Sequence, residues 1–175
     1  MAATININLD ADVDNVINAL NAYIIRLNGK LDEFCQRLAD IGYPVAEAGF
    51  ANAIYDGTND VSVTVESSST AMRAIVAVGS ATMFIEFGTG VTYPDDHPQM
   101  AEMGMVRGEY GYGLGALPHG WRYPASHGAG TNATPDPKHP GYLHTFGNPA
   151  NMPMYNATKE IEQNIERIAG EVFGT

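Results

Sequence analysis

The side chains best suited to chemistry gather in one segment of the chain, residues 92–147. All five histidines lie there with three aspartates: His97, His119, His127, His139 and His144, with Asp95, Asp96 and Asp136. Imidazole and carboxylate groups together suit zinc or iron, so a metal-dependent enzyme that uses this His-rich segment is one hypothesis. However, no two histidines have the spacing that puts a pair of ligands on one helical turn, and two of them precede a proline, which is typical of loops. We therefore predict no metal site and no cofactor.

Other catalytic patterns are also incomplete. Asp95 and Asp96 are adjacent, and the side chains of adjacent residues usually point apart, which disfavours an acid/base pair. The glycines at 111, 113 and 115 alternate, and they match neither the dinucleotide-binding fingerprint nor the phosphate-binding loop. No serine lies in a Gly-x-Ser-x-Gly elbow. We therefore predict that the protein is not an enzyme.

One carboxylate in the middle of the chain has an unusual setting. The segment 83–90 is apolar except for Glu86. A buried, unpaired carboxylate is costly, so Glu86 must reach water, cap a backbone or meet a cation. We interpret the segment as one or two turns of an apolar element ended by Gly88 and Gly90, because glycine adopts backbone angles that other residues resist.

The charge balance restricts the partners of the protein. The formal net charge is −11, and nine basic residues are spread along the chain without a cluster. Affinity for nucleic acid comes largely from cationic side chains, so direct DNA binding is disfavoured, although an acidic surface would let a duplex slide past. No apolar run approaches the roughly 20 residues of a membrane span, and the N-terminus lacks the features of a signal peptide. We predict a protein assembled in the cytoplasm, with no membrane contact.

A long amphipathic helix is predicted near the N-terminus. Apolar residues recur at steps of three and four: Val13, Val16, Ile17, Leu20, Ile24, Leu27, Leu31, Phe34, Leu38 and Ile41. Gly42 and Pro44 are expected to end this helix, which would be about 43 Å long at 1.5 Å per residue. A small domain needs no helix of that length for its core, so the stripe packs in the core, faces a neighbouring subunit, or does both. Cys35, the single cysteine, falls on the same apolar pattern and is predicted to be a small buried hydrophobe.

The remaining elements predict one α+β domain over residues 1–175. Residues 45–54 are rich in small side chains and indicate a second, short helix. Residues 61–65 alternate apolar and polar side chains, and 72–78 follow a serine-rich turn, which predicts a β-hairpin. Segment 92–147 is interpreted as an ordered insertion with short strands near 120–123 and 142–146, because its aromatic residues argue against disorder. Pro153 then opens an amphipathic C-terminal helix, predicted to pack on the sheet.

Two stretches, taken together and in this order, resemble a known family. Residues 81–90 resemble a signature that ends in Glu-Phe-Gly-Thr-Gly, and residues 148–157 resemble a second signature built on Pro-Ala and a following Pro-Met. Both are typical of the gene-product-ten-like tail-component, or tail-completion, family of long-tailed bacteriophages. The glycine- and aromatic-rich segment 92–147 resembles the loop that separates the two signatures in a longer subgroup.

The resemblance implies a structural virion protein of the phage neck. It implies a long N-terminal helix, a small antiparallel sheet and a C-terminal helix. It also implies a ring, typically of six subunits, that joins the head-side connector or stopper to the tail terminator or tail tube. In such a ring double-stranded DNA would pass the lumen without specific binding, at the head–tail junction of the virion. Within the same class, a tail terminator protein is the alternative.

These considerations give structural roles to particular residues. Phe84 and Phe87 are predicted to anchor the central element in the core. Glu86 is predicted to make a polar contact between elements or between subunits, and the insertion is predicted to reach a neighbour. The full set of structural or interface candidates is Phe84, Glu86, Phe87, Gly88, Gly90, Trp121, Tyr123, Pro149, Pro153 and Met154.

Overall fold

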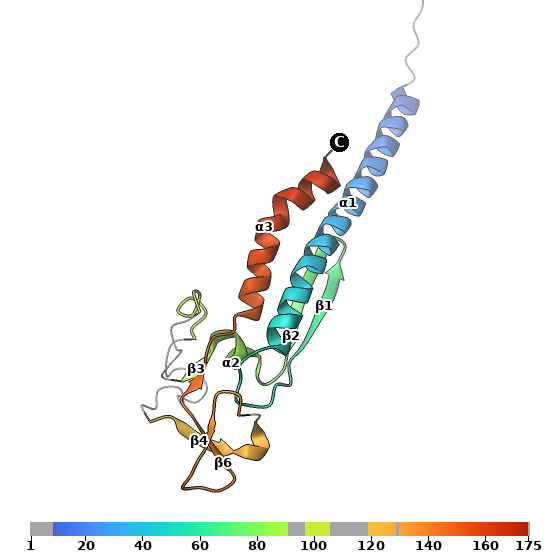
Figure 1. The fold of residues 1–175 in the computed structure, drawn as a ribbon. Coiled ribbons are helices and arrows are strands. Elements are labelled where there is room, and N and C mark those ends of the chain that lie inside the picture. The colour runs from blue at the N-terminus through green and yellow to red at the C-terminus, as the bar shows by residue number, and fades with distance from the viewer. Residues whose placement is uncertain (1–8, 91–96, 106–118, 129, 175) are drawn as a thin grey trace, which may run out of the picture.

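The computed structural model describes residues 9–90, 97–105, 119–128 and 130–174. Its longest element is the helix α1 (Leu9–Ala51), which at 43 residues is about 65 Å long. Figure 1 shows that the N-terminal part of α1 projects beyond every other described element. The opposite part of α1 lies between the C-terminal helix and a β-hairpin, and these three elements form the body of the molecule.

The prediction that α1 ends at Gly42 and Pro44, followed by a separate short helix, is wrong. The helix continues through Pro44 to Ala51. Proline in a helix interior costs about 3 kcal/mol, and here packing on both sides of α1 outweighs that cost. Gly42 is buried because the facing elements approach closely: a Cβ atom there would lie 2.5 Å from Ile161 Cδ1 and 2.7 Å from Ile75 Cδ1. This glycine permits close packing and does not mark a helix end.

The predicted hairpin is confirmed. Strands β1 (Ser62–Ser69) and β2 (Met72–Val78) pair in antiparallel register, from Ser62 opposite Val78 to Ser69 opposite Met72, with a bulge between Ser67 and Ser69. Ala71 completes the turn with a φ of 62°. The hairpin packs along α1 and reaches its middle, where the backbone N–H of Ala71 donates to Asp32 Oδ1 at 3.3 Å.

The central segment forms the short helix α2 (Thr82–Phe87), as predicted. Its residue Ile85 is fully buried and joins Phe50 and Ala81 in the core cluster, against which Val63 and Met154 pack. Strand β3 (Thr89–Gly90) follows directly and pairs in antiparallel fashion with β7 (Gly147–Asn148). The two stretches that carry the family resemblance therefore meet in space.

The described part of the insertion contains the two predicted strands. β4 (Trp121–Pro124) pairs in antiparallel fashion with β6 (Tyr142–Thr145), and β5 (Thr134–Pro135) pairs with the other edge of β6. A 3₁₀ turn, η2 (Ala125–His127), follows β4. Figure 1 places this small sheet at the end of the molecule opposite the N-terminus of α1.

The C-terminal helix α3 (Pro153–Phe173) begins at the predicted proline. It packs along α1, and it does not lie chiefly on the hairpin, as the sequence had suggested. The two helices run in opposite directions, because Pro153 approaches Gly49 while the ring of Phe173 lies 5.5 Å from that of Phe34. The fold is thus α+β, with a long N-terminal helix, small antiparallel sheets and a C-terminal helix against the first.

Candidate functional site

Glu86 caps the first turn of α3. Glu86 belongs to α2 and is buried. Its carboxylate accepts two backbone hydrogen bonds, from Met154 N to Oε2 at 2.8 Å and from Tyr155 N to Oε1 at 2.9 Å. The start of a helix carries a partial positive charge and unpaired N–H groups, so a carboxylate at this position is stabilising. The sequence left three environments open for Glu86: water, a backbone cap or a cation. In the structure its carboxylate caps a backbone of the same chain.

The cap satisfies the whole helix start. Besides the carboxylate, the carbonyl of Glu86 accepts the N–H of Met152 at 3.3 Å, and Pro153 has no N–H to satisfy. The next N–H, of Asn156, already donates to the Met152 carbonyl at 2.9 Å as the first intrahelical bond. One residue, 68 positions before Met154 in sequence, therefore accepts every donor that the start of α3 would otherwise leave unpaired. Met152 itself has a left-handed backbone and no side-chain cap.

His97 completes the buried cluster around this carboxylate. Its Nε2 lies 3.1 Å from Glu86 Oε1, and its Nδ1 accepts the backbone N–H of Gln99 at 3.1 Å. Because Nδ1 is an acceptor, the proton of the neutral ring lies on Nε2, which donates to Glu86. The imidazole is flanked by the rings of Phe87 and Tyr155, with centroids 4.3 and 5.4 Å away. We call Glu86, His97 and the start of α3 the capping cluster.

The connection from β7 to α3 is held against the end of α2. The N–H of Asn151 donates to the carbonyl of Ile85 at 2.9 Å, and its side chain forms a pair of hydrogen bonds with the backbone of Ile54, at 2.8 and 3.1 Å. Gly88 lets the two chains approach: a Cβ atom there would lie 2.6 Å from the backbone nitrogen of Ala150. Its φ of 75° and ψ of 172° fall in a region that only glycine adopts readily.

The other candidate residues have varied surroundings. Phe87 is buried as predicted, whereas Phe84 is only partly buried, and Ile85 fills the central core position in its place. Pro153 is fully buried against Gly49. Four candidates are partly buried: Trp121 and Tyr123 in β4, Pro149 shortly before α3, and Met154 in the first turn of α3. Gly90 pairs with Gly147 in the β3–β7 ladder.

Asp56 links the loop after α1 to β4 and β7, and sequence reasoning missed it. It is 3% exposed, its N–H donates to Asn148 Oδ1 at 2.8 Å, and its carbonyl accepts the hydroxyl of Tyr123 at 3.0 Å. One carboxylate oxygen accepts the N–H of Asn132, and the other has no hydrogen-bond partner among the described residues. Burial, followed by the nearby charge of Asp56, raises the pKa of Tyr123 to about 12. The only sequence signal for this residue was the Asp-Gly turn at the end of the predicted helix.

The histidines of the insertion are dispersed in the described structure. His97 belongs to the capping cluster, His139 Nδ1 lies 3.2 Å from Asp136 Oδ2, and His144 Nε2 lies 2.8 Å from the carbonyl of His119. Asp136 also accepts the N–H of Lys138 and pairs with Arg122, and these contacts lower its pKa to about 2. No three His, Cys, Asp or Glu side chains form a metal-binding group among the residues that the structure describes. Asp95 and Asp96 lie outside those residues.

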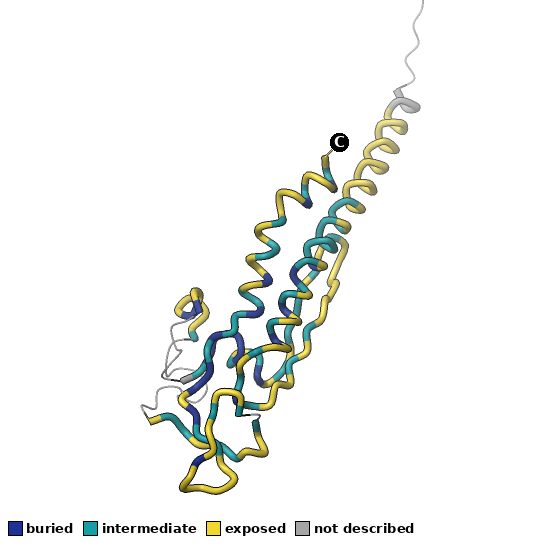
Figure 2. Tube along the Cα trace, in the orientation of Figure 1, coloured by how far each residue is buried: buried dark blue, intermediate teal, exposed yellow. Residues whose placement is uncertain are grey.

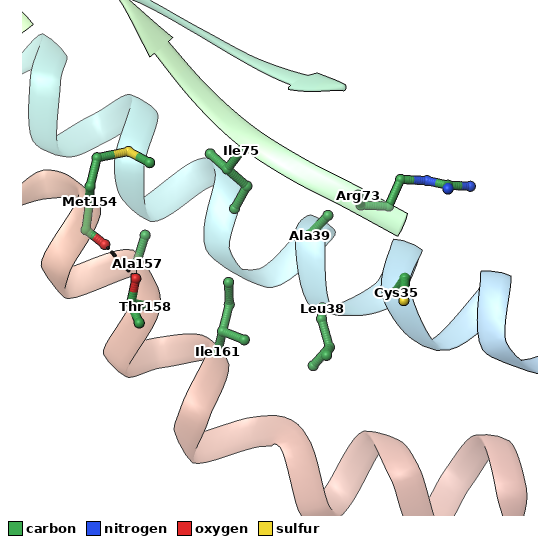
Figure 3. A pocket seen from close by; sticks show the side chains of 9 residues that line it. All are labelled: Cys35, Leu38, Ala39, Arg73, Ile75, Met154, Ala157, Thr158 and Ile161. Carbon is green, nitrogen blue, oxygen red and sulfur yellow. Dashed lines mark hydrogen bonds between the residues drawn. The ribbon is translucent and has the colours of Figure 1, made fainter. Parts of the chain in front are cut away.

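An open groove of about 300 Å³ lies between α1, β2 and α3. Figure 3 shows the nine side chains that line it: Cys35, Leu38, Ala39, Arg73, Ile75, Met154, Ala157, Thr158 and Ile161. The Cys35 thiol donates to the Ala71 carbonyl at 3.0 Å, Arg73 pairs with Asp32, and the Thr158 hydroxyl donates to the Met154 carbonyl. Every hydrogen-bonding side chain of the lining is thus engaged within the chain, whereas a small-molecule site needs polar groups directed at a ligand. Cys35, which was predicted to be a small buried hydrophobe, is only partly buried, and its thiol is hydrogen-bonded.

Comparison with known protein families, with curated proteins and with solved structures finds no match for this chain. Within the described residues, no helix has both the length and the apolar character needed to cross a bilayer.

Proposed function

We propose that the protein is a structural component of the neck of a long-tailed bacteriophage, where a ring of copies joins the head connector to the tail and lets DNA pass. The observation that carries this proposal is the capping cluster. The two stretches on which the family resemblance rests are 58 residues apart at their nearest ends, yet Glu86 of the first caps the helix that begins in the second. The two stretches that resemble the family signatures therefore form one contact, the cap of α3 by Glu86. Two signatures of one family are expected to form such a contact when they depend on each other in the fold.

The charge distribution supports passage of DNA without binding. The net charge is −11, and several arginines that could contact phosphates are already paired with carboxylates: Arg37 with Glu171, Arg73 with Asp32, Arg122 with Asp136, and Arg167 with Glu171. A ring of such subunits would present few free cations to a duplex, so the duplex would have little to displace its counterions. We propose six copies in the ring, with the head-side connector or stopper and the tail terminator or tube as the flanking partners.

Loss of the gene in the phage that encodes this chain tests the proposal. We expect DNA-filled heads and tails of normal length that fail to join, and restoration of infectious particles when the intact chain is supplied in trans. Tails of abnormal length would instead indicate the tail terminator, because a terminator stops tube growth. Normal yields of joined, infectious particles without the gene would refute a neck role of either kind.

A labelled chain locates the protein directly. A gold-conjugated antibody against the chain should mark the junction of head and tail in purified particles. A matched control uses the same antibody on particles lacking the gene. Label on the capsid shell or the tail tip, or no label on intact particles, would contradict the proposal.

A further inference from the structure

The N-terminal part of α1 lies outside the body of the molecule. Every residue from Val13 to Gly29 is exposed, and we call this range the overhang. Figure 2 shows it as a continuous exposed segment of helix. The body stops at the middle of α1, where Phe173 at the end of α3 meets Phe34 and the hairpin turn reaches Asp32.

Exposure of the overhang leaves a large apolar surface in water. Its exposed apolar side chains are Val13 (53%), Val16 (58%), Ile17 (49%), Leu20 (56%), Tyr23 (55%), Ile24 (51%), Ile25 (72%) and Leu27 (36%). All of these residues except Ile25 fall on one side of the helix, and an exposed apolar surface of this kind marks an interaction site.

The spacing of the apolar residues indicates that the partner of the overhang is a helix. Steps of four and three alternate without interruption over nine positions: Val13, Ile17, Leu20, Ile24, Leu27, Leu31, Phe34, Leu38 and Ile41. This is a repeat of 3.5 residues, the period that keeps one seam of a helix turned toward another helix. The lower part of the seam already has such a partner, because α3 packs on α1 there through contacts that include Phe34 with Phe173. The upper part continues the same seam without a partner among the described residues.

The overhang also lacks the composition of a helix that is stable alone. Between residues 13 and 29 it contains four asparagines, one glycine and five β-branched residues, all of them weaker helix formers than alanine or leucine. Most of the stability of helices in proteins comes from packing of an amphipathic face, so packing is expected to stabilise the overhang.

We propose that a second copy of this chain covers the overhang, and that the two overhangs pair as antiparallel helices. Charge favours this occupant. The chain as a whole carries −11, but within the overhang the only charged residues are Asp14 and Arg26, so two copies can meet there without net repulsion. A helix that lies on a membrane surface would instead carry a polar face rich in lysine and arginine, whereas the face opposite the seam here carries mainly asparagine and alanine, with Ile25 among them and Arg26 as the single basic residue of the overhang.

The position of α3 determines the orientation. α3 runs antiparallel to α1 along the seam and ends beside Phe34. A parallel partner helix would continue down the seam into the space that α3 occupies. The α1 helix of an antiparallel partner would instead begin near the end of α3 and extend away from the body. It would then run in the same direction as α3 and lie along the part of the seam that α3 does not cover. In that arrangement Leu20 of one copy faces Ile24 of the other, and Ile17 faces Leu27.

This pairing goes beyond the neck proposal and does not depend on it. A two-fold contact is complete with two copies and does not by itself build a ring. The proposed dimer is therefore a state of the free protein, before any ring assembles. A monomeric protein would leave the neck proposal intact, and a normal phage yield without the gene would leave the pairing intact.

Mass measurement of the purified full chain by sedimentation equilibrium tests the pairing. We expect a monomer–dimer equilibrium, and a rise in Kd of at least about 1,000-fold in the double variant Leu20→Glu/Ile24→Glu, because four carboxylates would then be buried in the seam. The control variant Asn18→Glu/Ala22→Glu adds the same charge on the face opposite the seam and should change Kd by less than about threefold. Both variants should keep the thermal unfolding of the body, because the overhang is exposed along its whole length. A wild-type monomer at about 100 µM, or a dimer that the seam variant leaves intact, would overturn the proposal.

Spin labels at three equivalent positions determine the orientation. Single cysteines are introduced by Asn15→Cys, Ala22→Cys and Gly29→Cys, each with Cys35→Ser, at positions seven residues apart on the outer face. In the antiparallel pair the distance between labels is shortest at position 22, and the other two pairs are displaced along the axis by about 21 Å. Equal distances at all three positions would show parallel helices and overturn the antiparallel arrangement.

Discussion

Replacement of Glu86 by alanine should destabilise the folded chain strongly. The substitution leaves the N–H groups of Met154 and Tyr155 without acceptors, and it leaves His97 Nε2 without its partner. Each buried backbone donor left unpaired costs about 1–3 kcal/mol, and loss of the negative charge at the helix start adds up to about 2 kcal/mol. We therefore expect the free energy of unfolding to fall by about 3–5 kcal/mol, a large part of the stability of an ordinary domain.

Two further variants separate the cap from other effects. Glu86→Gln retains one acceptor oxygen but turns an amide donor toward a backbone N–H, so the expected loss is smaller, about 1.5–3 kcal/mol. Glu66→Ala removes an exposed carboxylate from β1 and should change stability by less than about 0.5 kcal/mol.

Urea unfolding followed by circular dichroism, at one fixed protein concentration, measures these differences. Native-state hydrogen exchange locates them, because the amides of Met154 and Tyr155 should lose protection in Glu86→Ala. A loss of less than about 1 kcal/mol in this variant, or unchanged exchange at both amides, would refute the capping argument.

Two other perturbations test contacts at the two ends of α2. Gly88→Ala should lower the free energy of unfolding by about 2–4 kcal/mol, because the backbone conformation there suits only glycine and the new Cβ would meet Ala150 N at 2.6 Å. Gly104→Ala is its control, since that glycine also has a positive φ, 68°, but no atom within 4 Å of the added Cβ, so a loss as large as that of Gly88→Ala would contradict the close-contact argument. Asp60 accepts backbone hydrogen bonds from Ser80 and Ala81 at the start of α2, and these lower its pKa from 3.8 to about 2. Because the folded state favours ionised Asp60, this carboxylate stabilises the fold fully above about pH 4, and its contribution is lost as the pH falls toward 2. Asp60→Asn should therefore unfold with a weaker pH dependence between pH 4 and 2 than the wild type, and equal slopes in acid titrations would refute the assignment.

Local signals in the sequence predicted the elements well. The alternation at 61–65, the Gly-Thr-Gly after residue 87 and Pro153 each act within a few residues of the structure they specify. The end of α1 was predicted wrongly because Gly42 and Pro44 are local signals that tertiary packing overrides. Gly42 is required by the approach of Ile75 and Ile161, which come from elements that lie far along the chain.

For contacts between distant segments, the sequence predicted that a residue needs a partner but did not identify the partner. The requirement that Glu86 find a partner follows from the cost of burying a charge, but nothing near it in sequence identifies Met154 and Tyr155. The preference for Ile85 over Phe84 in the core depends on the direction in which a helix of only six residues faces, and the alternation of apolar residues does not determine that. Asp56 was missed for the same reason, since its partner Asn132 lies within the insertion and its partner Asn148 follows the insertion.

The capping cluster explains how a long insertion can be placed between α2 and α3 without separating them. Glu86 stands before the insertion, Met154 and Tyr155 stand after it, and His97 belongs to it. Because all three segments converge on one carboxylate, the first described residues of the insertion are anchored to the same point that starts the C-terminal helix. Among the described residues, the part of the insertion beyond His97 contributes no hydrogen bond to the Glu86 carboxylate. A change at His97 would instead act on α3 through Glu86, which links the insertion to the helix that packs against α1.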